Sequence, residues 1–134
     1  MQVIKSTKTY YCDVDETLLL FNSVDMYPQE ALVAITDPAS GITTHAFPHK
    51  RHIELMRQMK ARGYTVVVWS AGGHEWAARA VRALGIEKMV DVVIGKPDWF
   101  CDDLPASSYM KKPIYLHPTD PLKDERAQEI TDEE

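Results

Sequence analysis

The stretch YYCDVDETLLLF, residues 10–21 of this 134-residue chain, decides how the fold begins. Its aromatic first part is typical of a β-strand, and the leucines of its second part favour burial. Three acids, Asp13, Asp15 and Glu16, nevertheless lie between these apolar parts. Burying an ionised carboxylate without a partner is costly. We therefore expect the strand to end at these acids, where a metal ion, a basic side chain or solvent compensates their charge.

The composition indicates a single soluble domain. Hydrophobic residues make up 45% of the chain, and no run approaches the roughly 18 apolar residues of a membrane span. The first residues contain no apolar core of a signal peptide. Cys12 and Cys101 are too few for a disulfide framework and fit a reducing compartment. We therefore expect a cytoplasmic protein.

The acidic charge is concentrated at the C-terminal end. Residues 120–134 contain seven acids and two bases, which together account for the whole formal net charge of −5. Residues 1–119 are balanced at 13 acids and 13 bases, so they have no electrostatic bias towards nucleic acid or a membrane surface. We expect residues 1–119 to form one folded domain and residues 120–134 to form an acidic, poorly ordered tail.

Strand and helix patterns alternate along the chain. Residues 48–64 and 73–85 predict helices, because Pro48 suits the first turn of the former and Gly63 and Gly85 suit the two ends. The turn residues DPASG predict a β-hairpin flap at about residues 30–47, with arms at 32–36 and 42–47. Further strands are predicted at residues 8–15, 64–70, 89–95, 98–103 and 112–118. This alternation predicts a Rossmann-like, doubly wound α/β domain with a mostly parallel sheet.

Polar side chains follow four of these predicted strands at their carboxyl ends. In such a sheet, ligands bind beyond the carboxyl ends of the strands, so residues from separate strands converge there. A polar residue at one strand end is weak evidence for a ligand-binding site, but polar residues at four strand ends on one edge predict such a site. They are an acid pair, a hydroxyl, an ammonium and a second acid pair: Asp13 with Asp15, Ser70, Lys96, and Asp102 with Asp103.

These residue types suit phosphoryl transfer. Clustered carboxylates repel one another unless a cation neutralises them, and ligands that are all oxygen favour Mg²⁺. Such an ion and a fixed lysine can balance the charge of a transferring phosphoryl group. The turn SAGG, residues 70–73, offers a hydroxyl and backbone N–H groups for phosphate oxygens. The strand period puts Asp13 and Asp15 on one side, so one carboxylate can attack phosphorus while the other transfers protons.

In this order along the chain, the motifs resemble those of the haloacid dehalogenase-like superfamily. DVDET at residues 13–17 is similar to its DxDxT motif, and Ser70 after VVVW is similar to its second motif. Lys96 in GKP and the acids of FCDD at residues 100–103 are similar to the third and fourth. The similarity spans about residues 8–104. DxDxT alone is moderately specific, whereas four motifs in sequence are highly specific.

The resemblance implies a capless, Mg²⁺-dependent phosphatase that hydrolyses a phosphate monoester. Asp13 would be the nucleophile, and Asp15 the general acid and then the base for water. Glu16 occupies a position where many members have glycine, and we assign it no role. The remaining implied roles are phosphate binding and support of the loop by Thr17, Ser70, Ala71 and Lys96, and magnesium binding by Asp13, Asp15, Asp102 and Asp103.

The spacing of the motifs leaves little to cover the site. Lys96 lies only six residues before Asp102, and residues 18–48 hold only the short hairpin, so no cap domain fits at either point. An open site suits a phosphorylated macromolecule, which includes nucleic acid only as a substrate. A small phosphate ester, with a partner subunit closing the site, is equally compatible.

Two other functions stay open. A signalling receiver domain also uses acids, a hydroxyl and a lysine on a parallel sheet, but its acid pair comes first and its lysine last. Here the acid pair of Asp102 follows Lys96, which favours the phosphatase. A binding module without activity could share the same fold, since fold does not determine function.

Histidines and cysteines near the motifs have structural interpretations. His74 after SAGG is expected at the surface of a helix start. His49 and His52 form HxxH, which we interpret as a solvated helix start in preference to a zinc pair. Cys12 and Cys101 each precede an acid of the site, and we expect two small buried hydrophobic residues in preference to a redox pair.

Overall fold

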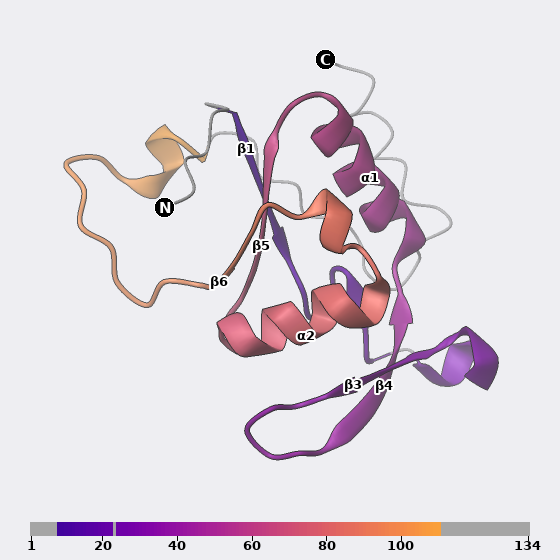
Figure 1. Ribbon diagram of the computed structural model, residues 1–134. Helices are drawn as coiled ribbons and strands as arrows, with labels where there is room; N and C mark the ends of the chain where they lie inside the picture. Colours follow the sequence, from indigo (N-terminus) through magenta and orange to yellow (C-terminus); the bar gives the residue numbers. More distant parts are fainter. Residues whose placement is uncertain (1–7, 23, 111–134) are drawn as a thin grey trace.

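A parallel sheet of three strands lies at the centre of the computed structural model, which describes residues 8–22 and 24–110 (Figure 1). The strands are β1 (Thr9–Asp13), β5 (Thr65–Ser70) and β6 (Val92–Gly95), in the spatial order β1-β5-β6. Each of these three strands was predicted from the sequence. Because all three run in the same direction, their carboxyl ends meet at one edge.

The two predicted helices connect these strands. Helix α1 (Lys50–Ala61) joins the hairpin to β5, and α2 (His74–Leu84) joins β5 to β6. Gly85, at a φ of +67°, ends α2 in the left-handed conformation that glycine adopts without steric cost. Short 3₁₀ helices complete the described chain: η1 (Val24–Met26), η2 (Gln29–Ala31), η3 (Glu87–Met89) and η4 (Ala106–Ser108).

Both helices pack on the same face of the parallel sheet. Side chains alternate along a strand, and the register pairs Cys12 with Val68, so these two residues share one face. They belong to one buried cluster together with Met56 of α1 and Ala77 of α2. Two successive right-handed crossovers that step in one direction along a sheet require this arrangement.

The predicted hairpin is present and forms a second sheet. Strands β3 (Val33–Thr36) and β4 (Thr43–Pro48) pair antiparallel, and β2 (Leu19–Leu20) adds a third strand on the far side of β4. Figure 1 shows this hairpin beyond the end of the parallel sheet where β5 leads into α2, and β3 packs against α2. The hairpin thus lies at the same end of the molecule as the predicted site.

The doubly wound sheet is found only in part. The described residues form an α/β structure with one parallel and one antiparallel sheet of three strands each, and both helices lie on one face of the parallel sheet. A second winding would need strands on the other side of β1, and the described residues supply none there. None of the helices in this part of the chain has the length and apolar character to cross a membrane.

The predicted strand at residues 98–103 is wrong. This segment forms no strand and loops out from the end of β6 (Figure 1). Its apolar residues Trp99 and Phe100 are 92% and 58% exposed, so no burial holds it against the sheet. Pro97 and Pro105 bracket it, and proline cannot donate to a ladder. The strand predicted at residues 112–118 and the tail at 120–134 lie outside the described residues.

The solvated helix start predicted for His49 and His52 is also wrong. Both are buried, and their rings stack with centroids 3.3 Å apart. His49 caps α1, because its Nδ1 accepts the backbone N–H of His52. His52 Nδ1 lies 2.6 Å from the carbonyl oxygen of Thr17, and the N–H of His49 donates to the carbonyl of Leu18. These contacts anchor the start of α1 to the chain segment that follows β1.

Two methionines provide a test of this core. Met56 is fully buried between α1 and the sheet, whereas Met26 is 72% exposed. Met56→Ala leaves a cavity and should lower the free energy of unfolding by about 2–5 kcal/mol. Met26→Ala, the matched control, should change it by less than about 0.5 kcal/mol. Urea denaturation measures both, and equal losses would contradict the packing described.

Candidate active site

A tight turn ends β1 and sorts polar from apolar side chains. The carbonyl oxygen of Val14 accepts the backbone N–H groups of Thr17, Leu18 and Leu19 at 2.9–3.1 Å. Val14, Leu18 and Leu19 are fully buried, whereas Asp15 is exposed. The turn therefore keeps the apolar residues of this stretch in the core and holds Asp13 and Asp15 at the end of the sheet.

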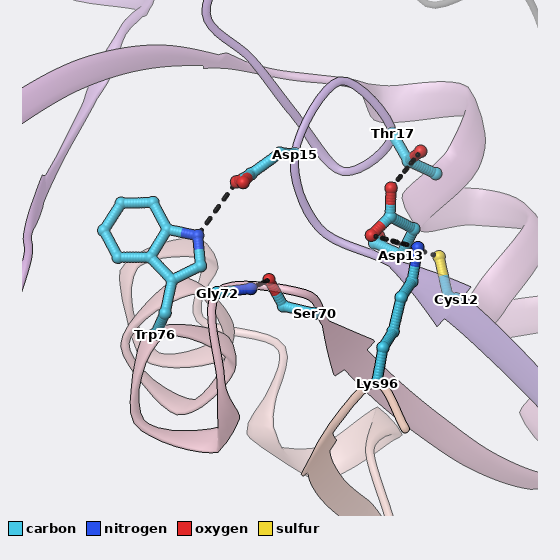
Figure 2. A network of polar contacts seen from close by, with 8 residues as sticks. All are labelled: Cys12, Asp13, Asp15, Thr17, Ser70, Gly72, Trp76 and Lys96. Carbon is cyan, nitrogen blue, oxygen red and sulfur yellow. Dashed lines mark hydrogen bonds and ion pairs between the residues drawn. The ribbon is translucent and has the colours of Figure 1, made fainter. Parts of the chain in front are cut away.

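Asp13 has a basic partner, as its charge requires. Its Oδ1 lies 3.2 Å from Lys96 Nζ, and its Oδ2 accepts a 3.3 Å hydrogen bond from the hydroxyl of Thr17 (Figure 2). The Asp13 and Lys96 side chains are 32% and 35% exposed. An ion pair at this exposure contributes only about 0–1 kcal/mol, so an incoming anion can compete for Lys96 at small cost.

The turn at residues 70–73 is held against Lys96 by one carbonyl group. The carbonyl oxygen of Ser70 accepts the N–H of Gly73 at 3.1 Å and that of Lys96 at 2.9 Å. The Ser70 hydroxyl is buried and accepts the N–H of Gly72 at 3.0 Å, so its own hydrogen is left to donate. Ala71 lies exposed at the tip of the turn. The predicted phosphate-binding residues therefore lie together.

Glycine permits the close approach of β6 to the start of α2. A Cβ atom on Gly95 would lie 3.4 Å from Gly73 Cα and 3.6 Å from the backbone nitrogen of His74. Gly73 itself has a φ of +102°, which few other residues adopt. This packing brings Lys96, which follows Gly95, next to the positive end of the α2 dipole. His74 is exposed there, as predicted.

Asp15 faces a partner that the sequence analysis did not identify. Trp76 Nε1 donates a 2.8 Å hydrogen bond to Asp15 Oδ1, and in Figure 2 the Asp15 carboxylate points towards this indole and away from Asp13. Trp76 is the third residue of α2. Its place in the first turn of a helix that begins at the predicted site was the available signal.

The second acid pair is not assembled with the first. Asp102 and Asp103 are exposed in the segment that loops away after β6, where Asp102 Oδ1 accepts the N–H of Leu104 at 3.1 Å. Among residues 8–22 and 24–110, no three His, Cys, Asp or Glu side chains form a group that could hold a metal ion. Asp13 and Asp15 supply two acids with protein partners, and as they lie these residues do not fit a magnesium site.

Glu16 receives a structural role. Its φ of +59° is left-handed, which explains why glycine suits this position. Its Oε1 accepts the backbone N–H groups of Phe21 and Asn22 at 2.7 and 3.0 Å. Glu16 therefore ties the turn after β1 to the two residues that follow β2.

Substitutions of Glu16 separate the effect of its left-handed backbone from that of its hydrogen bonds. Glu16→Ala loses the carboxylate but keeps the left-handed backbone, and should lower the free energy of unfolding by about 2 kcal/mol. Glu16→Gly loses the same hydrogen bonds but removes the steric cost, so it should be about 1 kcal/mol more stable than the alanine variant. Denaturant unfolding measures both values. Equal stabilities for the two variants would contradict the strained conformation.

The two cysteines lie in different environments. Cys12 is buried and Cys101 is exposed, so the expectation of two buried residues is right for Cys12 and wrong for Cys101. Burial raises the pKa of the Cys12 thiol to about 12, and the neighbouring charge of Asp13 adds to the rise. A thiol with this pKa stays protonated at neutral pH, which argues against a redox pair.

Alkylation tests this difference. Iodoacetamide reacts with the thiolate, so at mildly alkaline pH Cys101 should react in the folded protein while Cys12 does not. Both should react in denaturant, which serves as the control. Peptide mass mapping identifies the modified residue, and equal modification of both cysteines in the folded protein would contradict the burial of Cys12.

Comparison of the chain with protein-family models, with curated proteins and with solved structures finds no match. The functional assignment therefore depends on the motifs and on the geometry described above.

Proposed function

We propose that the protein is a phosphatase that hydrolyses a phosphate monoester through an aspartyl-phosphate at Asp13. The observation that supports this most is the surroundings of the Asp13 carboxylate. It lies between the hydroxyl of Thr17 and the ammonium of Lys96, and Lys96 is bound through its backbone to Ser70. A nucleophile, a cation and a turn rich in N–H groups thus meet at one edge of the sheet.

In the first step, an oxygen of Asp13 attacks the phosphorus atom of the ester. The bond from phosphorus to the leaving oxygen breaks, and Asp15 donates a proton to that oxygen. Lys96, the Ser70 hydroxyl and the backbone N–H groups at residues 71–72 would hold the other phosphoryl oxygens, whose charge the start of α2 also favours.

In the second step, water attacks the phosphorus atom of the aspartyl-phosphate. Asp15, now ionised, accepts a proton from this water, and the bond between phosphorus and the Asp13 oxygen breaks. Inorganic phosphate leaves, and both aspartates return to their first state. The two aspartates thus have separate tasks, which agrees with their separate partners, Lys96 and Trp76.

The proposal includes Mg²⁺ because the motifs resemble those of the haloacid dehalogenase-like superfamily. When bound, the ion would neutralise charge between the carboxylates and the phosphoryl group. The ligands that the resemblance implies, Asp13, the backbone carbonyl of Asp15, and Asp102 or Asp103, do not form a magnesium site as they lie in the described structure, so no step above is assigned to the ion. The need for metal is therefore tested separately from the need for Asp13.

The open surroundings of Asp13 are compatible with two classes of substrate, a phosphorylated macromolecule and a small phosphate ester. In the described part of the chain, the hairpin of β3 and β4 is the element beyond this end of the sheet, and no cap domain is present. A phosphorylated macromolecule would reach such a site directly. A small ester would need closure by a partner subunit to exclude water.

Hydrolysis of p-nitrophenyl phosphate tests the proposal. We expect turnover by the wild type with Mg²⁺, its loss with a chelator, and its recovery when Mg²⁺ is restored. Asp13→Asn removes the nucleophile and should lower kcat at least about 1,000-fold, since it removes the covalent route. Asp98→Asn, on the exposed segment, is a control that should keep activity.

Three outcomes would contradict parts of this account. Equal activity of the wild type and Asp13→Asn excludes Asp13 as the nucleophile. Activity unaffected by the chelator excludes the magnesium requirement. A stable phosphorylated protein without turnover favours the receiver-like acceptor over the phosphatase.

A further inference from the structure

We propose that Trp76 is a positioning residue of this site, which holds one oxygen of Asp15 so that the other exchanges the proton with the substrate. The inference rests on the proposed phosphatase function. It begins from one contact: the indole Nε1 donates to Asp15 Oδ1 at 2.8 Å. The contact joins two residues that are 61 positions apart in the sequence, one on the turn after β1 and one in the first turn of α2.

The chemistry of indole makes this contact directional. Its N–H donates a hydrogen bond and cannot accept one. Asp15 Oδ1 accepts the indole N–H, so it does not carry the acid proton. A proton on Oδ1 would point at the hydrogen of the indole. Oδ2 is therefore the oxygen that gives its proton to the leaving group and later accepts one from water.

The indole ring has two neighbours in the described structure. A Cβ atom on Gly72 would lie 3.2 Å from Trp76 Cδ1, so the ring packs closely over the turn that follows β5. The ring of Phe21 lies 6.2 Å from that of Trp76, measured between centroids. Trp76 therefore ties the acid to the same turn that would bind the phosphate.

Phe21 also links the indole back to the turn that bears Asp15. The N–H of Phe21 donates to Oε1 of Glu16, the residue next to Asp15, at 2.7 Å. A closed path of contacts thus runs from Glu16 to Phe21, to Trp76 and to Asp15. An exposed aspartate on a turn would otherwise sample several rotamers, and this path selects one of them.

Leaving groups of different basicity reveal a positioning role. An alkyl leaving group needs a proton as its bond to phosphorus breaks, whereas p-nitrophenolate leaves readily without one. Trp76→Phe keeps an aromatic ring over Gly72 and loses the N–H. It should lower the single-turnover rate of phosphoryl transfer from glycerol 2-phosphate about tenfold and leave that rate for p-nitrophenyl phosphate nearly unchanged. Any slowing of the second step, in which Asp15 is the base for both esters, should be the same for both.

The matched control is Trp99→Phe. It makes the same chemical change on a side chain that is 92% exposed, outside the proposed mechanism, and should leave the ratio of the two single-turnover rates as in the wild type. If Trp76→Phe also leaves that ratio unchanged, or changes only KM, the positioning role is overturned. If the wild type hydrolyses neither ester, the proposed function fails, and the contact is judged by the following measurement alone.

Nuclear magnetic resonance of the indole N–H reports the contact without substrate or metal. The Trp76 signal is assigned by its absence in Trp76→Phe. Asp15→Ala should shift this signal and speed its exchange with solvent, and Asp15→Asn, which keeps an acceptor oxygen, should restore it in part. The Trp99 signal should stay unchanged in each. A Trp76 signal that is unaffected by Asp15→Ala overturns the inference whatever the activity.

Discussion

Three backbone hydrogen bonds to the carbonyl oxygen of Val14 are the constraint on which the rest of the structure depends. They reverse the chain directly after β1, so that Val14, Leu18 and Leu19 enter the core while Asp15 between them stays exposed at the sheet edge. The start of α1 is bonded to the same turn through Leu18 and Thr17. Without this reversal, the stretch that opens the fold would bury its carboxylates or expose its leucines.

The elements that local patterns predict are those with strong periodicity and clear ends. The β-branched run of β5, the glycine-bounded α2 and the turn between β3 and β4 all contain their own signals. Residues 98–103 show the limit of such signals, because two aromatic residues between prolines look like a strand but have no partner strand. The burial of His49 and His52 depends on Thr17, which is distant in sequence, so no local rule reveals it.

The candidate site likewise contains residues whose position could be predicted from the sequence and residues whose position could not. Parallel topology brings Asp13, Ser70 and Lys96 to one edge, so the spacing of strand ends was sufficient to predict their convergence. The contact between Trp76 and Asp15 joins residues 61 positions apart, and it depends on how α2 packs over the turn rather than on strand order. For Asp102 and Asp103 the prediction assumed a fourth strand, and the described segment supplies none.

Borohydride trapping tests the central claim, that Asp13 becomes phosphorylated, most directly. An aspartyl-phosphate is reduced by borohydride to homoserine, whereas a free carboxylate is not. The protein is incubated with p-nitrophenyl phosphate and Mg²⁺, reduced, digested and analysed by mass spectrometry. The account predicts homoserine at position 13, dependent on the ester and absent from Asp13→Asn. An unmodified Asp13 in protein that is turning over the ester, or a phosphoryl group found on another residue, would contradict it.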